Sequence, residues 1–131
     1  MTGKSAKRRH KLARERKNRT KKVCPIHAIE LKYAPRTNTD FWVCPEPGCE
    51  IGCGGGTTST PCDAETDRLR QRAHAALDPL WKNKTPFHSR DAAYAWLAGV
   101  LGIAERDCHV GYFTADQCRA VLKAVRTLTT P

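Results

Sequence analysis

The residues of this chain that could do chemistry are cysteines and histidines gathered in its first half. Cys24 and His27 are separated by two residues. Sixteen residues lie between His27 and Cys44, and Cys44 and Cys49 have four residues between them. A turn of two to four residues brings two thiolate or imidazole ligands to one Zn²⁺ ion, at bond lengths of about 2.0–2.3 Å. The spacing predicts one structural zinc ion held by Cys24, His27, Cys44 and Cys49.

Cys53 is an alternative ligand for the same ion. It follows Cys49 with three residues between them, a gap that also suits a metal-binding turn. If Cys53 and Cys49 formed the second turn, His27 would be displaced from direct contact with the metal. The spacing alone leaves both ligand sets open.

The chain contains seven cysteines, an odd number, and they follow no apolar signal segment. No apolar run approaches the roughly 20 residues that a membrane helix needs. We therefore expect no membrane association and a reducing cytoplasm. In that compartment cysteines at this spacing bind metal rather than form disulfides.

Basic residues are concentrated at the N-terminus. Residues 1–22 contain eleven Lys or Arg and one acid, so they account for the whole formal net charge of +10. This arm has almost no apolar residues, and we expect it to be disordered alone and helical only against a polyanion such as nucleic acid. The candidate phosphate contacts are Lys7, Arg8, Arg9, Lys11, Arg14, Arg16, Lys17, Arg19, Lys21 and Lys22.

The metal-binding turns lie in a segment with the pattern of a zinc ribbon. Apolar and charged residues alternate from Ile29 to Tyr33, which is typical of a half-buried strand. A turn leads to a second strand at 41–44, and a third short strand is expected at 50–53. Trp42 and its neighbour Phe41 point to opposite faces of the second strand, so we expect one to pack in the core and the other to be available for stacking on a base, although core packing is the expectation for each taken singly. Trp42 is the candidate for base stacking.

The rest of the chain predicts three helices. The first spans about 61–81, after an N-cap threonine and a proline. The second runs from an N-cap at Ser89 to a C-terminal glycine, Gly102, and the third follows a capping box at Thr114.

These elements predict an α+β protein built from a small zinc ribbon and a three-helix region. The expected organisation is a basic arm at 1–22, a zinc ribbon at 23–59 and a helical region at 60–131 packed on the ribbon. The glycine-rich segment 54–59 is expected to be a flexible linker.

Six motifs together resemble the small zinc-finger-containing proteins of phages and prophages. They are Val23–His27, Phe41–Pro45, Ile51–Cys53, Arg70–Trp81, Ala93–Leu97 and Cys108–Phe113. The resemblance covers residues 23–125 and implies this fold and a phage setting, but it implies no reaction. The chain departs from it at His27, where we expect a cysteine, and in the longer second turn.

The arm resembles the arginine-rich RNA-hairpin-binding helices of the lambdoid phage antiterminators. The resemblance is carried by residues 6–10 and 12–16, Ala-Lys-Arg-Arg-His and Leu-Ala-Arg-Glu-Arg. It implies RNA rather than DNA as the partner of the arm.

Three functions fit these features. The first is a non-enzymatic protein that binds RNA or DNA, and the second is a module that docks on the transcription or translation machinery of a host. The third, a metal-dependent nuclease, needs an open coordination position, which four protein ligands do not leave. We expect no small-molecule substrate.

Overall fold

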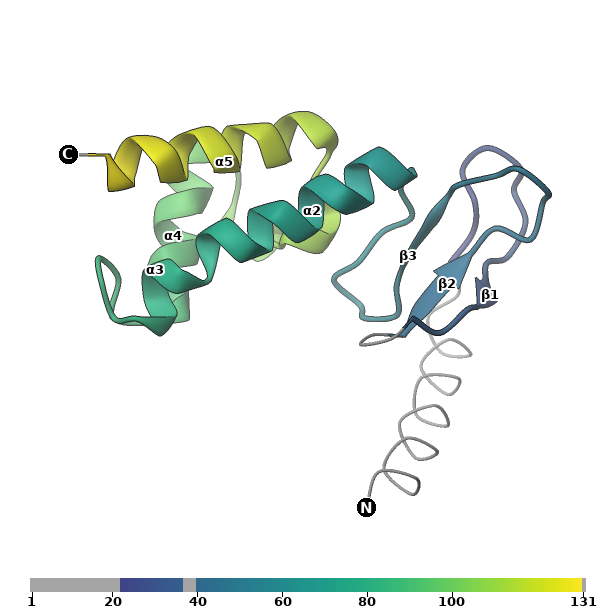
Figure 1. Cartoon of the computed structure of the whole chain (residues 1–131), viewed down its shortest axis with the longest axis horizontal. Coiled ribbons are helices and arrows are strands. Elements are labelled where there is room, and N and C mark those ends of the chain that lie inside the picture. Colours follow the sequence, from purple (N-terminus) through teal and green to yellow (C-terminus); the bar gives the residue numbers. More distant parts are fainter. Residues whose placement is uncertain (1–21, 37–39, 131) are drawn as a thin grey trace, which may run out of the picture. The chain divides into compact units, whose positions relative to one another are not determined.

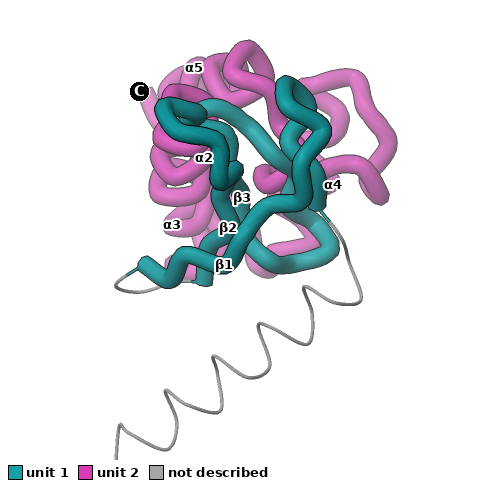
Figure 2. The backbone as a smooth tube through the Cα atoms, turned by 90° about the vertical axis from the view of Figure 1, so that its right-hand side faces the viewer, with its two compact units in different colours: residues 1–64 teal, residues 65–131 magenta. Residues whose placement is uncertain are grey.

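The structure, a computed structural model, describes residues 22–36 and 40–130. The chain divides into two compact units, Met1–Ala64 and Glu65–Pro131, which are coloured separately in Figure 2. We call the described part of the first unit the ribbon unit and the described part of the second unit the helical unit. The candidate phosphate contacts from Lys7 to Lys21 lie outside the described residues.

The ribbon unit contains one antiparallel sheet of three short strands. They are β1 (Lys32–Tyr33), β2 (Phe41–Val43) and β3 (Gly52–Gly54), in the order β1-β2-β3 (Figure 1). Trp42, in the middle strand, lies opposite Tyr33 on one side and Cys53 on the other. Together with the helices described below, this sheet confirms the α+β fold expected from the sequence.

The first strand is shorter than the alternation of apolar residues predicts. The carbonyl of Ile29 accepts a hydrogen bond from the amide of Cys24 (2.9 Å), so the backbone at Ile29 closes the first metal-binding turn. Leu31 is buried as expected, whereas 37% of Ile29 stays exposed. Of the alternating residues from Ile29 to Tyr33, only the last two, Lys32 and Tyr33, form a regular strand.

Trp42 is a core residue and not a base-stacking surface. Only 1% of it is exposed, and it packs with Leu31 and Ile51 in the small core of the ribbon unit. Its ring also lies 5.1 Å from that of Tyr33. Because a base can stack only on an accessible ring face, the prediction that Trp42 contacts nucleic acid is wrong.

The glycine-rich segment 54–59 is a structured turn rather than a linker. The ammonium group of Lys22 donates hydrogen bonds to the carbonyls of Gly56 (2.7 Å) and Ser59, and the hydroxyl of Ser59 accepts one from the amide of Gly54 (3.1 Å). Beyond it, Cys62 forms an antiparallel bridge with a residue of β3. Residues 60–64 therefore belong to the ribbon unit.

Gly55 shows how tightly this turn packs. A Cβ atom at Gly55 would lie 2.0 Å from Cζ3 of Trp42, whereas one at Gly56 would meet its nearest neighbour, the amide nitrogen of Thr58, at 3.9 Å. We expect Gly55→Ala to destabilise the ribbon unit by about 1–3 kcal/mol, because the buried indole must shift, and Gly56→Ala to have little effect. Hydrogen exchange of the β2 amides measures both variants, and equal protection in the two would contradict the packing.

Apart from Ala64, the first residue of the first α-helix, the helical unit holds the four α-helices and two short 3₁₀ turns of the described residues. The α-helices are α2 (Ala64–Leu77), α3 (Pro79–Lys82), α4 (Arg90–Leu101) and α5 (Ala115–Thr129), and the turns are Glu105–Asp107 and Val110–Tyr112 (Figure 1). The first predicted helix is thus two helices. Pro79 has no amide hydrogen to continue the hydrogen-bond ladder of α2, and α3 starts there. The start is later than predicted because Cys62 uses its backbone in the bridge to β3.

The predicted ends of the second helix and the predicted start of the third are confirmed by their hydrogen bonds. Ser89 caps α4 by accepting from the amide of Ala92 (3.1 Å), and Gly102 ends it with φ of +67°. At α5, the hydroxyl of Thr114 accepts from the amide of Gln117 (3.1 Å), and the Gln117 side chain accepts from the amide of Thr114 (3.0 Å). These caps satisfy backbone groups that would otherwise lack partners.

The helical unit has its own apolar core, centred on Leu77, Leu97, Phe113 and Val121. Cys108 and Cys118 are buried in it as small side chains. Burial raises the pKa of the Cys108 thiol, and the nearby carboxylate of Glu105 raises it further. A protonated, buried thiol is a poor nucleophile and metal ligand.

None of the helices in the described part of the chain is both long and apolar enough to span a membrane.

Candidate metal centre

The first metal-binding turn presents Cys24 and His27 from one tight loop. The carbonyl of Cys24 accepts a hydrogen bond from the amide of Ala28 (2.8 Å), while its own amide bonds to the carbonyl of Ile29 (2.9 Å). Ala28 takes a positive φ of 55°, which is uncommon for a residue other than glycine. The loop therefore adopts a strained backbone conformation at Ala28, and this conformation directs both side chains to one point.

The second turn starts where β2 ends. The amide of Cys44 bonds to the carbonyl of Ile51 (2.9 Å), which fixes Cys44 beside the chain that leads into β3. The amide of Cys49 bonds to the carbonyl of Glu46 (3.0 Å), and Gly48 has a φ of +80°. This reverse turn accommodates the four residues between Cys44 and Cys49 and brings the two side chains together.

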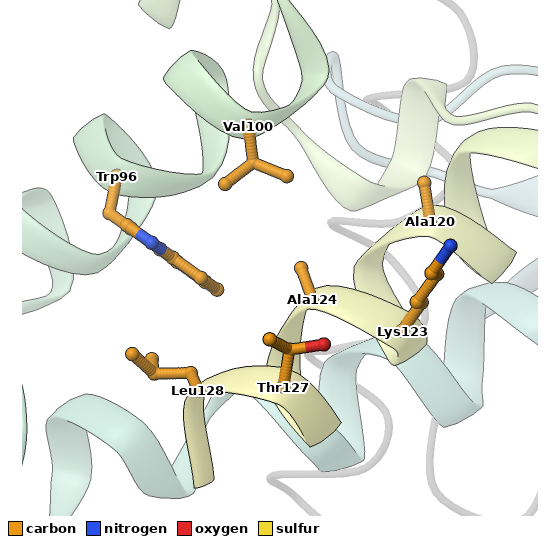
Figure 3. A pocket seen from close by; sticks show the side chains of 7 residues that line it. All are labelled: Trp96, Val100, Ala120, Lys123, Ala124, Thr127 and Leu128. Atoms are coloured by element: carbon orange, nitrogen blue, oxygen red, sulfur yellow. The ribbon is translucent and has the colours of Figure 1, made fainter. Parts of the chain in front are cut away.

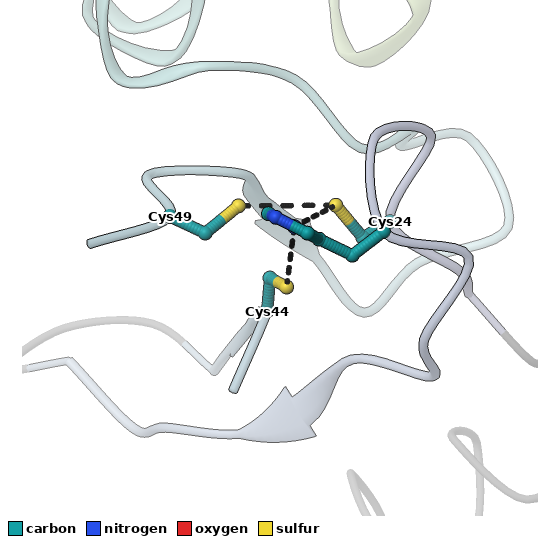
Figure 4. A group of neighbouring side chains, drawn as sticks. Cys24, Cys44 and Cys49 are labelled. Atoms are coloured by element: carbon teal, nitrogen blue, oxygen red, sulfur yellow. Dashed lines mark hydrogen bonds between the residues drawn. The ribbon is translucent and has the colours of Figure 1, made fainter. Parts of the chain in front are cut away.

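The four predicted ligands converge on one point, and the sulfurs of Cys24, Cys44 and Cys49 face each other across it (Figure 4). All four ligand atoms lie within 4.8 Å of one another. The Sγ atoms of Cys24 and Cys49 are 3.8 Å apart, and Nδ1 of His27 lies 3.7 Å from Sγ of Cys24 and 3.6 Å from Sγ of Cys44.

These separations are the edges of a zinc tetrahedron. With Zn–S bonds of about 2.3 Å and a Zn–N bond of about 2.05 Å, a tetrahedral site has edges of about 3.8 Å between sulfurs and about 3.6 Å between sulfur and nitrogen. The three separations given above, one between sulfurs and two between sulfur and nitrogen, match these lengths to about 0.1 Å. Thiols form only weak hydrogen bonds, drawn as dashed lines in Figure 4, and the same separations fit ligand-to-ligand distances around a shared ion.

A comparison with known protein families points to the same chemistry. The family model described as a zinc-finger-containing domain matches residues 19–128. The chain belongs to this family. Neither a search of the curated proteins nor one of the solved structures found a match. The donor set and the family agree, and the site of this zinc-finger-containing domain can hold one zinc ion.

Cys53 lies elsewhere in the zinc-finger-containing domain. It is in β3, opposite Trp42, and is buried with it in the core of the ribbon unit. The group of ligand atoms is formed by Cys24, His27, Cys44 and Cys49, and Cys53 is not part of it. The histidine is the exposed member of the group, while Cys24 and Cys44 are buried.

The thiols of the site interact strongly with one another. Burial raises the pKa of Cys24, but backbone hydrogen bonds with His27 and Ile26 outweigh it and bring this pKa down to about 6. Burial also raises the pKa of Cys44, and the neighbouring thiols of Cys49 and Cys24 help to raise it to about 11. Without a cation the cluster therefore resists holding several thiolates. A zinc ion removes this conflict, because it binds thiolates and displaces their protons.

Lys22 is the one candidate phosphate contact that the structure describes. Its ammonium group is bonded to the carbonyls of Gly56 and Ser59. Its hydrogen-bonding capacity is thus largely used within the ribbon unit, where it holds the end of the arm against the turn at 54–59.

Spacing alone did not single out the aliphatic side chains around the first metal-binding turn. Ile26 is 69% exposed, and Val23 and Ile29 are also exposed. Ile26 also borders a hollow of about 450 Å³, which is lined by the ligands His27 and Cys49 and by Glu50 and Asp63. Exposed apolar side chains beside a concave surface are typical of contact sites for other molecules.

The division into units shows an uneven charge distribution in the folded part of the chain. Residues 23–64 carry two cations and five acids, a net charge of −3, whereas residues 65–131 carry ten cations and seven acids, a net charge of +3. A zinc ion with three thiolates and one neutral imidazole adds a further formal charge of −1 to the ribbon unit. The neutral folded body expected from the sequence is therefore an acidic ribbon followed by a basic helical unit.

Proposed function

We propose that this protein binds nucleic acid through its N-terminal arm, and that the zinc ribbon is the scaffold to which the arm is attached. The observation that carries the proposal is the charge distribution: residues 1–22 hold a net charge of +10, while the ribbon unit next to them is acidic. A negatively charged ribbon repels phosphate, and the helical unit carries a net charge of only +3, so the arm is the largest source of attraction for phosphate.

RNA from a phage-infected cell is the nucleic acid that best fits this proposal. The support is the resemblance of residues 6–16 to the arginine-rich helices that bind RNA hairpins, together with the resemblance of the folded part to phage zinc-finger-containing proteins. An arginine-rich segment that becomes helical against RNA gains its affinity mainly from phosphate contacts.

The zinc ion has a structural role in this proposal. Four protein ligands complete a tetrahedral shell, which leaves no position for a water molecule or a substrate to be activated. We therefore propose a binding protein rather than a nuclease.

Replacing Arg8 and Arg9 by alanine tests the proposal. If about eight cations of the arm neutralise phosphates, log affinity falls with log salt with a slope near −7, and loss of two cations flattens it by about 2. The matched control is Arg68→Ala with Arg72→Ala, which removes two exposed cations from α2. Fluorescence anisotropy with an RNA hairpin at several salt concentrations measures both proteins, and equal slopes for the two would refute the role of the arm.

A second function, docking on host transcription or translation machinery, is favoured by the exposed aliphatic residues Val23, Ile26 and Ile29. In this alternative the arm steers the protein towards RNA-containing surfaces and the first metal-binding turn makes the contact. Affinity purification after nuclease treatment separates the two functions. A partner that is retained without nucleic acid, and lost from the Ile26→Ser variant, would support docking.

A further inference from the structure

The helical unit has an open apolar groove between α4 and α5 (Figure 3). Trp96 and Val100 of α4 form one wall, and Ala120, Ala124 and Leu128 of α5 form the other wall and the floor. The groove has a volume of about 420 Å³, which is within the range of roughly 300–1,000 Å³ typical of binding sites. It lies entirely within the helical unit.

The exposed face of α4 lacks the polar side chains of an ordinary surface helix. No charged residue occurs between Asp91 and Glu105, although that stretch includes exposed positions. Val100 is 47% exposed, and across the groove Leu128 is 39% exposed. A surface helix normally turns charged and polar residues to water. This face is therefore suited to contact with another apolar surface.

The α5 side of the groove carries a row of positive charge. Arg119, Lys123 and Arg126 follow each other at intervals of four and three residues, so they lie along one side of the helix. Arg119 bonds to Glu65 (2.8 Å) and Asp116 (3.0 Å), while Lys123 itself lines the groove. The groove thus has an uncharged side formed by α4 and a cationic side formed by α5.

We propose that this groove binds one amphipathic helix of a protein partner, with its apolar face in the groove and a row of acidic residues along Lys123 and Arg126. The shape fits a helix, because Ala120 and Ala124 are small and let a second helix approach closely. Apolar side chains of the partner at i, i+3 or i+4, and i+7 would lie between Trp96, Val100 and Leu128. Acids on one flank would complement the cations of α5.

A second copy of this chain is a poorer occupant than an acidic helix. The lining of the groove includes Lys123 and no acidic residue, so the same face of a second copy would offer the cations of α5 no opposite charge. Nucleic acid would satisfy the cations but would leave the apolar side chains of Trp96, Val100 and Leu128 without an apolar partner. The combination of one apolar and one cationic side favours an acidic amphipathic helix.

Two synthetic helical peptides of about 15 residues test this inference in the zinc-loaded full-length protein. Both carry leucines at i, i+4, i+7 and i+11, and one has glutamates on one flank where the other has lysines. We expect the acidic peptide to shift the amide resonances of Val100, Ala124 and Leu128 in NMR spectra, and to bind at least tenfold more tightly when affinity is measured from these resonances, which report on the groove and not on the basic arm.

Substitutions at exposed positions identify the groove without disturbing the core. Val100→Ser and, independently, Leu128→Ser should weaken binding of the acidic peptide about fivefold or more. Lys123→Glu should lower the affinity for the acidic peptide and raise the affinity for the basic one, each by up to about fivefold. Arg72→Glu, on the exposed surface of α2, is the matched control and should leave the preference between the peptides unchanged.

Several results would overturn the inference. They are equal affinity for the two peptides, resonance shifts confined to other residues, or a Lys123→Glu variant whose preference is unchanged. Sedimentation that shows a dimer of the free protein, lost in Val100→Ser, would mean that a second copy covers the groove.

Discussion

Replacing Cys44 by serine should abolish zinc binding and unfold the ribbon unit, while the helical unit stays folded. Structural zinc contributes on the order of 10 kcal/mol to small modules, which is comparable with the whole stability of a domain. The core cluster of the ribbon unit is small: besides cysteines, its buried members are Leu31, Trp42 and Ile51. Burial of these apolar side chains cannot replace the stabilisation that zinc provides. The helical unit contains none of the four ligands and has its own core.

Native mass spectrometry and NMR spectroscopy measure these two effects. The unchanged protein should bind one zinc ion, and the Cys44→Ser variant should bind none and lose the dispersed resonances of the three strands. Addition of a strong chelator to the unchanged protein should produce the same spectrum. A metal-free protein that keeps its ribbon resonances would show that zinc is not required for the fold.

Cys53→Ala is the matched control, because Cys53 is a buried cysteine of the same unit that lies outside the ligand group. It should keep one zinc ion and lose only about 1 kcal/mol from the small cavity. His27→Ala should weaken zinc binding far more. The reverse result, with zinc lost from Cys53→Ala and kept by His27→Ala, would establish Cys53 as the fourth ligand.

The metal site could be predicted from the sequence because its geometry is local. Each pair of ligands is joined by a short turn, so spacing alone places Cys24 beside His27 and Cys44 beside Cys49. The helix ends at Ser89, Gly102 and Thr114 are equally local, since a capping residue bonds to a neighbour a few positions away. Features of this kind require no knowledge of the remaining fold.

Features that depend on distant residues could not be predicted in this way. A strand pattern gives Trp42 one of two faces but does not say which face is buried, and the answer depends on Leu31, Ile51 and the close approach of Gly55. The turn at 54–59 looks flexible in sequence because its main support comes from Lys22, more than thirty residues away. The groove in the helical unit likewise needs two helices to be placed side by side.

Deleting residues 1–21 is expected to remove nearly all affinity for nucleic acid. The deletion takes away ten of the 23 cations and one acid, so the remaining chain has a net charge of only +1. With the phosphate contacts of the arm gone, affinity for an RNA hairpin should fall by roughly a hundredfold or more at 0.1 M salt, and the salt slope should move from about −7 towards zero. Anisotropy titrations at several salt concentrations measure both quantities.

The Cys44→Ser variant gives the decisive comparison for the role of the arm. All ten cations that the deletion removes lie N-terminal to the ligands, so unfolding of the ribbon leaves them in place. If the arm provides the phosphate contacts, this variant keeps most of the affinity and the full salt slope, and it loses at most the preference for a particular RNA. If loss of zinc instead removes binding while loss of the arm does not, the folded ribbon is the part that contacts nucleic acid, despite its negative charge. The two variants thus assign phosphate binding to the arm or to the ribbon by opposite results in the same titration.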